Sequence, residues 1–66
     1  MTKTEAIIIL RLAEIADVAG AYHALGADEI GAAMPALLTA GKVEQSGEDM
    51  WSTFAAQDEA WAVWAA

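Results

Sequence analysis

The side chains of this chain that could do chemistry are one histidine, a few hydroxyls and three adjacent pairs of carboxylates. His23 is the only histidine and there is no cysteine. A nucleophile would therefore have to pair His23 with Ser46 or Ser52, and no motif joins these residues. His23 lies three residues before Gly26, where the end of a helix favours an imidazolium. We therefore expect no enzyme.

The paired carboxylates are Asp28–Glu29, Glu48–Asp49 and Asp58–Glu59. Carboxylates can bind calcium or transfer protons, but adjacent residues on a helix point apart, and the spacing of a calcium-binding loop is absent. Each pair also lies where a helix start or a turn favours acidic residues. The glycines are too widely spaced for a phosphate-binding loop. We expect no metal ion and no cofactor.

The length and composition predict a single domain over residues 1–66 with an excess of apolar side chains. A domain of this size buries only about 60% of its unfolded surface, and without cysteine it has no disulfides. Yet 58% of the residues are hydrophobic and the mean hydropathy is +0.36. So many apolar groups cannot all be buried in one small chain, which predicts a self-association or partner surface.

The charge restricts the partners. The chain has ten acidic and three basic residues, which gives a net charge of −7. Lys3, Arg11 and Lys42 are too few and too dispersed to neutralise phosphates, which argues against nucleic acid and anionic membrane surfaces as direct partners. The apolar run Ala6–Leu10 is far shorter than the roughly 20 residues of a membrane span. We expect a cytoplasmic protein whose partner is a basic protein surface.

Helices are predicted over most of the chain. Thr2 and Glu5 match a capping box that starts a first helix, whose apolar stripe comprises Ile8, Leu12, Ile15, Ala19 and Tyr22. A break near residues 17–20 would give a second short helix ending at Gly26 with positive φ. Asp28 is expected to cap the next helix, which Pro35 kinks or splits and Gly41 ends.

Residues 42–54 allow two interpretations. They can form a β-hairpin around Gly47–Glu48–Asp49, or Ser46 can cap a further helix. Residues 55–66 are helical in both. The first interpretation gives a mainly helical α+β fold with one hairpin, and the second gives an all-α bundle of three or four helices.

The order of these elements resembles a winged helix-turn-helix domain over residues 5–54. The resemblance rests on an apolar first helix, a short Ala-rich helix ending at Leu25–Gly26, and an Asp–Glu start to the third. The stretch Leu37 to Glu44, the Gly-Glu-Asp turn and Met50–Phe54 then correspond to the end of the third helix and the wing. In that family the third helix enters the major groove. Here the matching surface would consist of acidic and small residues: Asp28, Glu29, Ala32, Ala33, Ala36 and Thr39.

The resemblance thus implies the fold of a DNA-binding domain without its basic surface. In size and charge the chain is similar to phage-encoded inhibitors, including anti-CRISPR and other DNA-mimic proteins. The resulting hypothesis is a small acidic protein that binds and inhibits a basic, nucleic-acid-handling partner. The expected partner-binding residues imitate phosphates, with a tryptophan as anchor: Asp28, Glu29, Glu44, Glu48, Asp49 and Trp51.

The alternative hypothesis is a structural or assembly module, which predicts a homo-oligomer. Its contact surface would be the apolar side of the first helix: Ile7, Ile8, Leu12 and Ile15. The aromatic residues Trp51, Phe54, Trp61 and Trp64 lie within the last sixteen positions. They either close the core or serve as interface anchors.

Overall fold

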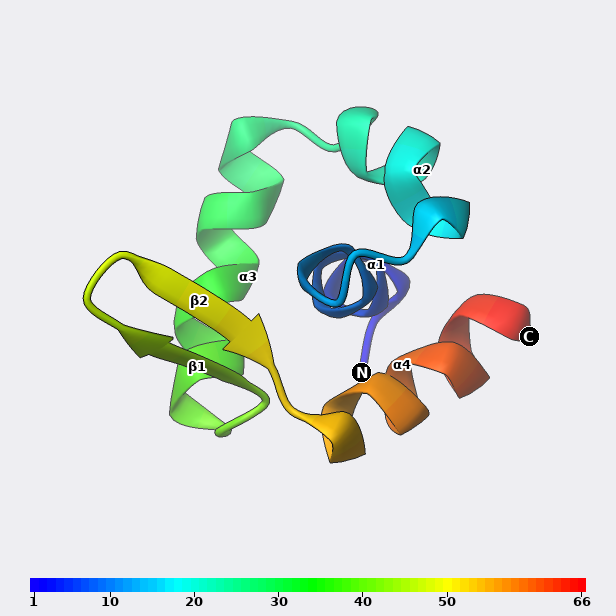
Figure 1. Ribbon diagram of the computed structural model, residues 1–66. Coiled ribbons are helices and arrows are strands. Elements are labelled where there is room, and N and C mark those ends of the chain that lie inside the picture. Colours follow the sequence, from blue (N-terminus) through cyan, green and yellow to red (C-terminus); the bar gives the residue numbers. More distant parts are fainter.

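Helix α1 lies at the centre of the fold and the other elements surround it (Figure 1). The computed structural model describes residues 1–66. In chain order the elements are α1 (Lys3–Leu12), a 3-10 turn η1 (Ala16–Val18), α2 (Ala19–His23), α3 (Ala27–Thr39), β1 (Val43–Ser46), β2 (Asp49–Ser52) and α4 (Phe54–Ala65). The predicted mainly helical α+β class with one hairpin is confirmed, and the all-α alternative is wrong.

Five consecutive residues of α1 are buried: Ala6, Ile7, Ile8, Ile9 and Leu10, none of them more than 7% exposed. Because consecutive side chains of a helix point in different directions, this burial requires cover on every side. Contacts with α2, α3, β2 and α4 provide it. The surrounding elements complete the core with Val18, Leu37, Val43, Ala56 and Ala60. The apolar run therefore forms the middle of the core.

Two helices end in the same hydrogen-bonded motif with different residues. At the end of α1, Glu14 N–H donates to the Arg11 carbonyl at 2.9 Å and Ile15 N–H to the Leu10 carbonyl at 3.0 Å. At the end of α3, Gly41 and Lys42 donate in the same way to Leu38 and Leu37. Both are Schellman motifs, whose first residue after the cap takes positive φ. Glu14 at φ 62° and Gly41 at φ 72° occupy that position.

This ending corrects the predicted first helix. The stripe was expected to run on towards Tyr22 with a break near residues 17–20, but α1 stops at Leu12. Glu14 reverses the chain, and Ile15 continues in extended conformation. Glutamate rarely adopts positive φ, so the residue type at position 14 did not indicate that the helix ends there. The predicted end of the third helix at Gly41 is confirmed.

Glu14→Gly is expected to stabilise the fold by about 1 kcal/mol, because glycine takes positive φ without a Cβ penalty. In a domain of this size that raises the melting temperature by roughly 4–8 °C. The reverse change, Gly41→Ala, is expected to lower it by a similar amount, since only the backbone conformation opposes a side chain there. Thermal unfolding followed by circular dichroism measures both. Glu14→Ala controls for the lost charge, and a stabilisation equal to that of Glu14→Gly would contradict the backbone explanation.

The helix starts are capped mostly as expected. The capping box is present: Thr2 N–H donates to Glu5 Oε1 at 2.7 Å, and Glu5 N–H donates to Thr2 Oγ1 at 3.1 Å. For α3 the prediction was wrong, since Gly26 is the N-cap, in extended conformation, and Asp28 lies in the first turn. Gly26 thus begins a helix and does not end one with positive φ. Pro35 lies inside α3, which continues past it as one helix.

The capping box predicts a small dependence of stability on pH. The hydrogen bond from the Thr2 backbone N–H lowers the pKa of Glu5 below its ordinary value. A carboxyl with a lower pKa in the folded state stabilises the fold above its unfolded pKa and loses that contribution as pH falls through the folded pKa. Glu5→Gln keeps the capping geometry. We expect its melting temperature to lie slightly below that of the wild type at pH 7 and to converge with it in acid, once the Glu5 carboxyl is protonated in the folded state. A difference that persists in acid would contradict this origin.

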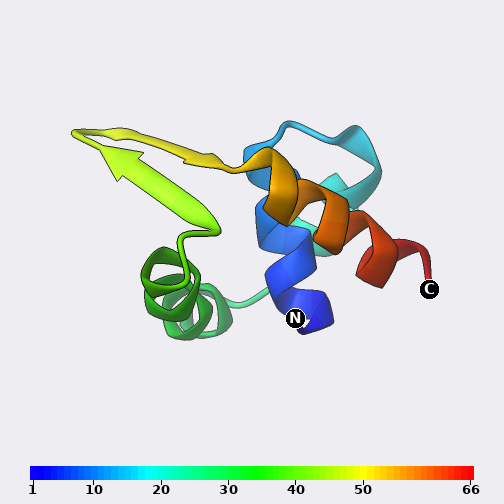
Figure 2. The same cartoon turned by 90° about the horizontal axis from the view of Figure 1, so that it is seen from below.

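The hairpin pairs β1 with β2 in an antiparallel register that places Val43 opposite Ser52 and Glu44 opposite Trp51. The two residues between the strands are Gly47 and Glu48, and of these only Gly47 has positive φ, at 60°. Positive φ at the first turn residue alone is the pattern of a type II′ turn. Figures 1 and 2 show the hairpin extending sideways from the helical body, with its turn farthest from α4.

Ser52 attaches the hairpin to the core. Its buried hydroxyl donates to the Ile9 carbonyl of α1 at 2.8 Å, and the Gln57 side chain of α4 donates to the Ser52 carbonyl at 3.0 Å. Val43, directly opposite, is also buried. The base of the hairpin is therefore fixed by hydrogen bonds and packing. In its outer half Met50 still packs against the core, while residues 44–49 are exposed.

Candidate functional site

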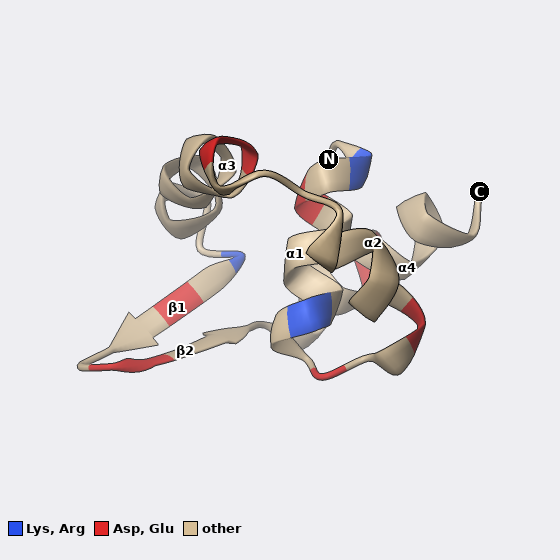
Figure 3. Cartoon of the chain, turned by 90° about the horizontal axis from the view of Figure 1, so that it is seen from above, with Lys and Arg blue, Asp and Glu red and all other residues tan.

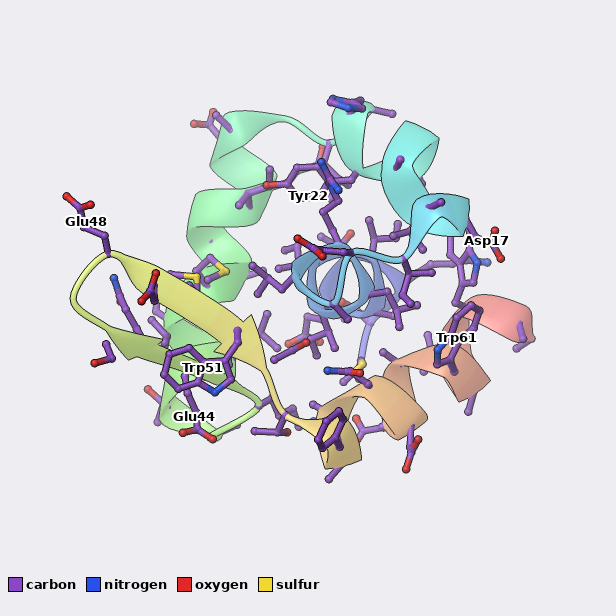
Figure 4. The ribbon with its side chains drawn as sticks, viewed as in Figure 1. Asp17, Tyr22, Glu44, Glu48, Trp51 and Trp61 are labelled. Atoms are coloured by element: carbon purple, nitrogen blue, oxygen red, sulfur yellow. The ribbon has the colours of Figure 1, made fainter.

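Four of the six predicted partner-binding residues lie on the hairpin: Glu44, Glu48, Asp49 and Trp51, which we call the acidic hairpin. Because side chains alternate along a strand, Glu44, Asp49 and Trp51 share the face opposite to buried Val43 and Ser52. Figure 4 shows Glu44 beside Trp51, and Glu48 at the tip. All three carboxylates are exposed, and Trp51 is 41% exposed. The face therefore presents an aromatic side chain among negative charges.

No cation of the chain neutralises these carboxylates. Lys42 precedes β1, but its ammonium binds Glu59 of α4 at 2.9 Å. Lys3 lies over the Trp64 ring at 5.4 Å, and Arg11 lies over the Tyr22 ring at 5.7 Å. Glu59 lies within 4.0 Å of both Lys42 and the N-terminal ammonium, and no other carboxylate lies that close to a cationic group. The carboxylates of the acidic hairpin therefore have no ion-pair partner within the chain.

Asp28 and Glu29, the other two predicted phosphate mimics, lie elsewhere. They occupy the first turn of α3. Figure 3 shows this acidic segment well apart from the acidic segments of the hairpin. Negative charges at this position are stabilised by the positive end of the helix dipole. The six predicted partner-binding residues therefore form two separate groups, and only the hairpin group combines acid with an exposed aromatic residue.

The apolar side of α1, which was predicted to be a self-association surface, is largely buried within the chain. Ile7 and Ile8 are 7% and 2% exposed, and both lie in the core of the chain itself. Leu12 and Ile15 are half-buried and pack against the same core. Ile7 and Ile8 therefore cannot form an exposed contact surface, because the elements around α1 cover them.

Two of the four exposed large apolar side chains lie on α4, and the other two are Leu38 of α3 and Trp51 of β2. Phe54, the first residue of α4, is 85% exposed, and Trp61 is 38% exposed. Seven positions are two helical turns, so both lie on one side of α4, with exposed Asp58 between them. Trp64, by contrast, is half-buried beside Lys3. The aromatic α4 face, comprising Phe54, Asp58 and Trp61, was missing from the predicted site, and only the seven-residue spacing of its aromatic residues indicates it.

The side chains considered for catalysis, His23 and Ser52, make separate contacts elsewhere in the fold. The His23 ring lies edge-on to Tyr22 with centroids 6.3 Å apart, and Ser52 Oγ is bound to Ile9. No three His, Asp or Glu side chains converge as metal ligands, and the surface has no pocket. The groups considered for catalysis thus do not converge, whereas the acidic hairpin and the aromatic α4 face each gather exposed side chains.

Comparison with protein-family models, characterised proteins and solved structures gives no match to this chain. None of its helices combines the length and hydropathy that crossing a bilayer would need.

Proposed function

We propose that this chain is a small acidic interaction protein that binds a basic, nucleic-acid-handling protein and inhibits it by imitating nucleic acid. The observation that carries the proposal is the projecting hairpin, with three exposed carboxylates that no cation of the chain neutralises. Exposed carboxylates offer a lysine- and arginine-lined surface the same sign of charge as phosphates. Occupation of that surface would exclude the nucleic acid.

The shape of the hairpin supports the same conclusion. A two-stranded ribbon is narrow enough to enter grooves that an entire domain cannot, and here its tip carries Glu48 and Asp49. Trp51 would add buried apolar area to the contact with the partner. Its position among polar groups is typical of an interface anchor. Long-range attraction would speed association, and the contact would weaken as salt rises. The proposal places this activity in the cytoplasm.

A pull-down tests the proposal. The tagged protein is incubated with nuclease-treated lysate of its host, washed at low and then high salt, and the eluates are identified by mass spectrometry. We expect a basic nucleic-acid-binding protein that elutes with salt. Recovery of only salt-resistant partners without a basic surface would contradict the proposal.

A homo-oligomeric assembly module is the second candidate, and the 85% exposure of Phe54 favours it. Its contact would now involve α4 and not α1. Such an assembly is expected to persist at high salt because buried apolar area is not screened. Light scattering at micromolar concentration distinguishes the candidates, since a monomer would exclude this one.

A further inference from the structure

The aromatic α4 face has no role in the fold that accounts for its residues. Phe54 begins the helix, where Thr53 supplies the cap by accepting from Ala56 N–H at 3.2 Å, so capping does not require an aromatic residue. Its side chain is 85% exposed and contributes little to the core. Trp61 and Asp58 are exposed on the same side. Exposed apolar residues with a charge among them are typical of an interaction surface.

The chain's own cations indicate what such aromatic residues bind. Two of its aromatic residues already hold a cation: Trp64 under Lys3, and Tyr22 under Arg11. The other three, Trp51, Phe54 and Trp61, have no cation over their rings and are the exposed ones. Along α4, Phe54 and Trp61 are separated by about 10 Å of helix, and the carboxylate of Asp58 lies between them without an ion-pair partner.

We infer that the aromatic α4 face binds an arginine side chain of the partner, with the guanidinium stacked on Trp61 or Phe54 and paired with Asp58. This inference rests on the proposed function and specifies the chemistry of the partner. Arginine fits better than lysine because its planar group stacks on aromatic rings and binds a carboxylate through two N–H groups. A second copy of this chain fits poorly, since an antiparallel α4 pair would bring two Asp58 carboxylates together and neither has a cation partner.

The test uses two synthetic decapeptides, one with four arginines and one with lysines at the same positions. Binding to the intact protein is measured by calorimetry at about 50 mM salt. We expect the arginine peptide to bind roughly 3- to 10-fold more tightly. The double variant Phe54→Ala, Trp61→Ala is expected to bind both peptides equally, and Phe54→Tyr, Trp61→Phe is expected to restore most of the preference.

Three controls make the outcome specific. Leu38→Ala removes an exposed apolar side chain, 37% exposed, from α3 and is expected to leave the preference unchanged. Glu48→Lys with Asp49→Lys is expected to lower the affinity for both peptides by the same factor, so the ratio of the two affinities stays unchanged. Circular dichroism verifies that each variant is folded.

Equal affinity of the wild type for the two peptides would overturn the inference, as would a preference that survives the double alanine variant. A dimer that Phe54→Ala dissociates would also overturn it, because a second copy would then occupy the face. The proposed function is judged separately. If the captured partner depends on the acidic hairpin but not on Phe54 and Trp61, the inhibitor proposal stands and this inference fails.

Discussion

Reversing Glu48 and Asp49 to lysine is expected to weaken binding to the captured partner by roughly 10- to 100-fold at low salt. Each reversal removes an attraction and adds a repulsion at the tip of the hairpin, where both carboxylates are exposed and unpaired. The loss is expected mainly in the association rate, and it should shrink as salt screens the charges. Adding Glu44→Lys, on the same outer face, is expected to weaken binding further.

The chain offers a matched control for this experiment. Glu14→Lys with Asp17→Lys changes the net charge by the same amount, and both residues are exposed. Figure 4 places Asp17 on the opposite side of the molecule from Glu48. We expect this control to reduce affinity only slightly. Equal losses in the two double variants would show that overall charge, and not the hairpin, attracts the partner.

Ile8→Ala is expected to have the largest effect on stability, a loss of about 2–5 kcal/mol. The side chain is 2% exposed in the middle of the core, and a protein of this size has a total stability of only about 3–10 kcal/mol. We therefore expect the melting temperature to fall by at least about 10 °C, with much of the variant unfolded at 37 °C. Circular dichroism during heating gives the result directly.

Phe54→Ala is the matched comparison, because it deletes a large apolar side chain that is 85% exposed. Its effect on stability is expected to stay within about 0.5 kcal/mol. The pair of variants also tests the position of α1. If Ile8→Ala kept its melting temperature and instead dissociated an oligomer, α1 would be an interface and its placement at the centre of the core would be wrong.

The predictable parts of the fold are those encoded over short distances. The capping box of Thr2 and Glu5 and the positive φ of Gly41 depend on residues within a few positions. The hairpin was one of two alternatives, because residues 46–54 also carry helical propensity. The strands place Val43 and Ser52 in the core, where the Ser52 hydroxyl donates to Ile9 of α1. That contact spans 43 positions for Ser52 and Ile9, so local pattern cannot show it.

The incorrect predictions have two physical causes, one in the local backbone and one in long-range packing. The end of α1 requires Glu14 in a conformation that its residue type disfavours. The burial of Ile7 and Ile8 depends on elements that arrive later in the chain. For the site, the shared face of Glu44, Asp49 and Trp51 follows from alternation along the strands only once the strand register is known. The exposure of Phe54 was one of two alternatives left open for the aromatic residues, because a phenylalanine in an apolar-rich segment is usually expected in the core.

The most direct test of the central claim is a competition between this protein and nucleic acid for the captured partner. The partner is first bound to a fluorescently labelled duplex, and the protein is then added while anisotropy is recorded. We predict that the duplex is released as the protein binds, and that the Glu48→Lys, Asp49→Lys variant releases far less at the same concentration. A stable complex that contains the partner, the protein and the duplex together would contradict imitation of nucleic acid by the acidic hairpin.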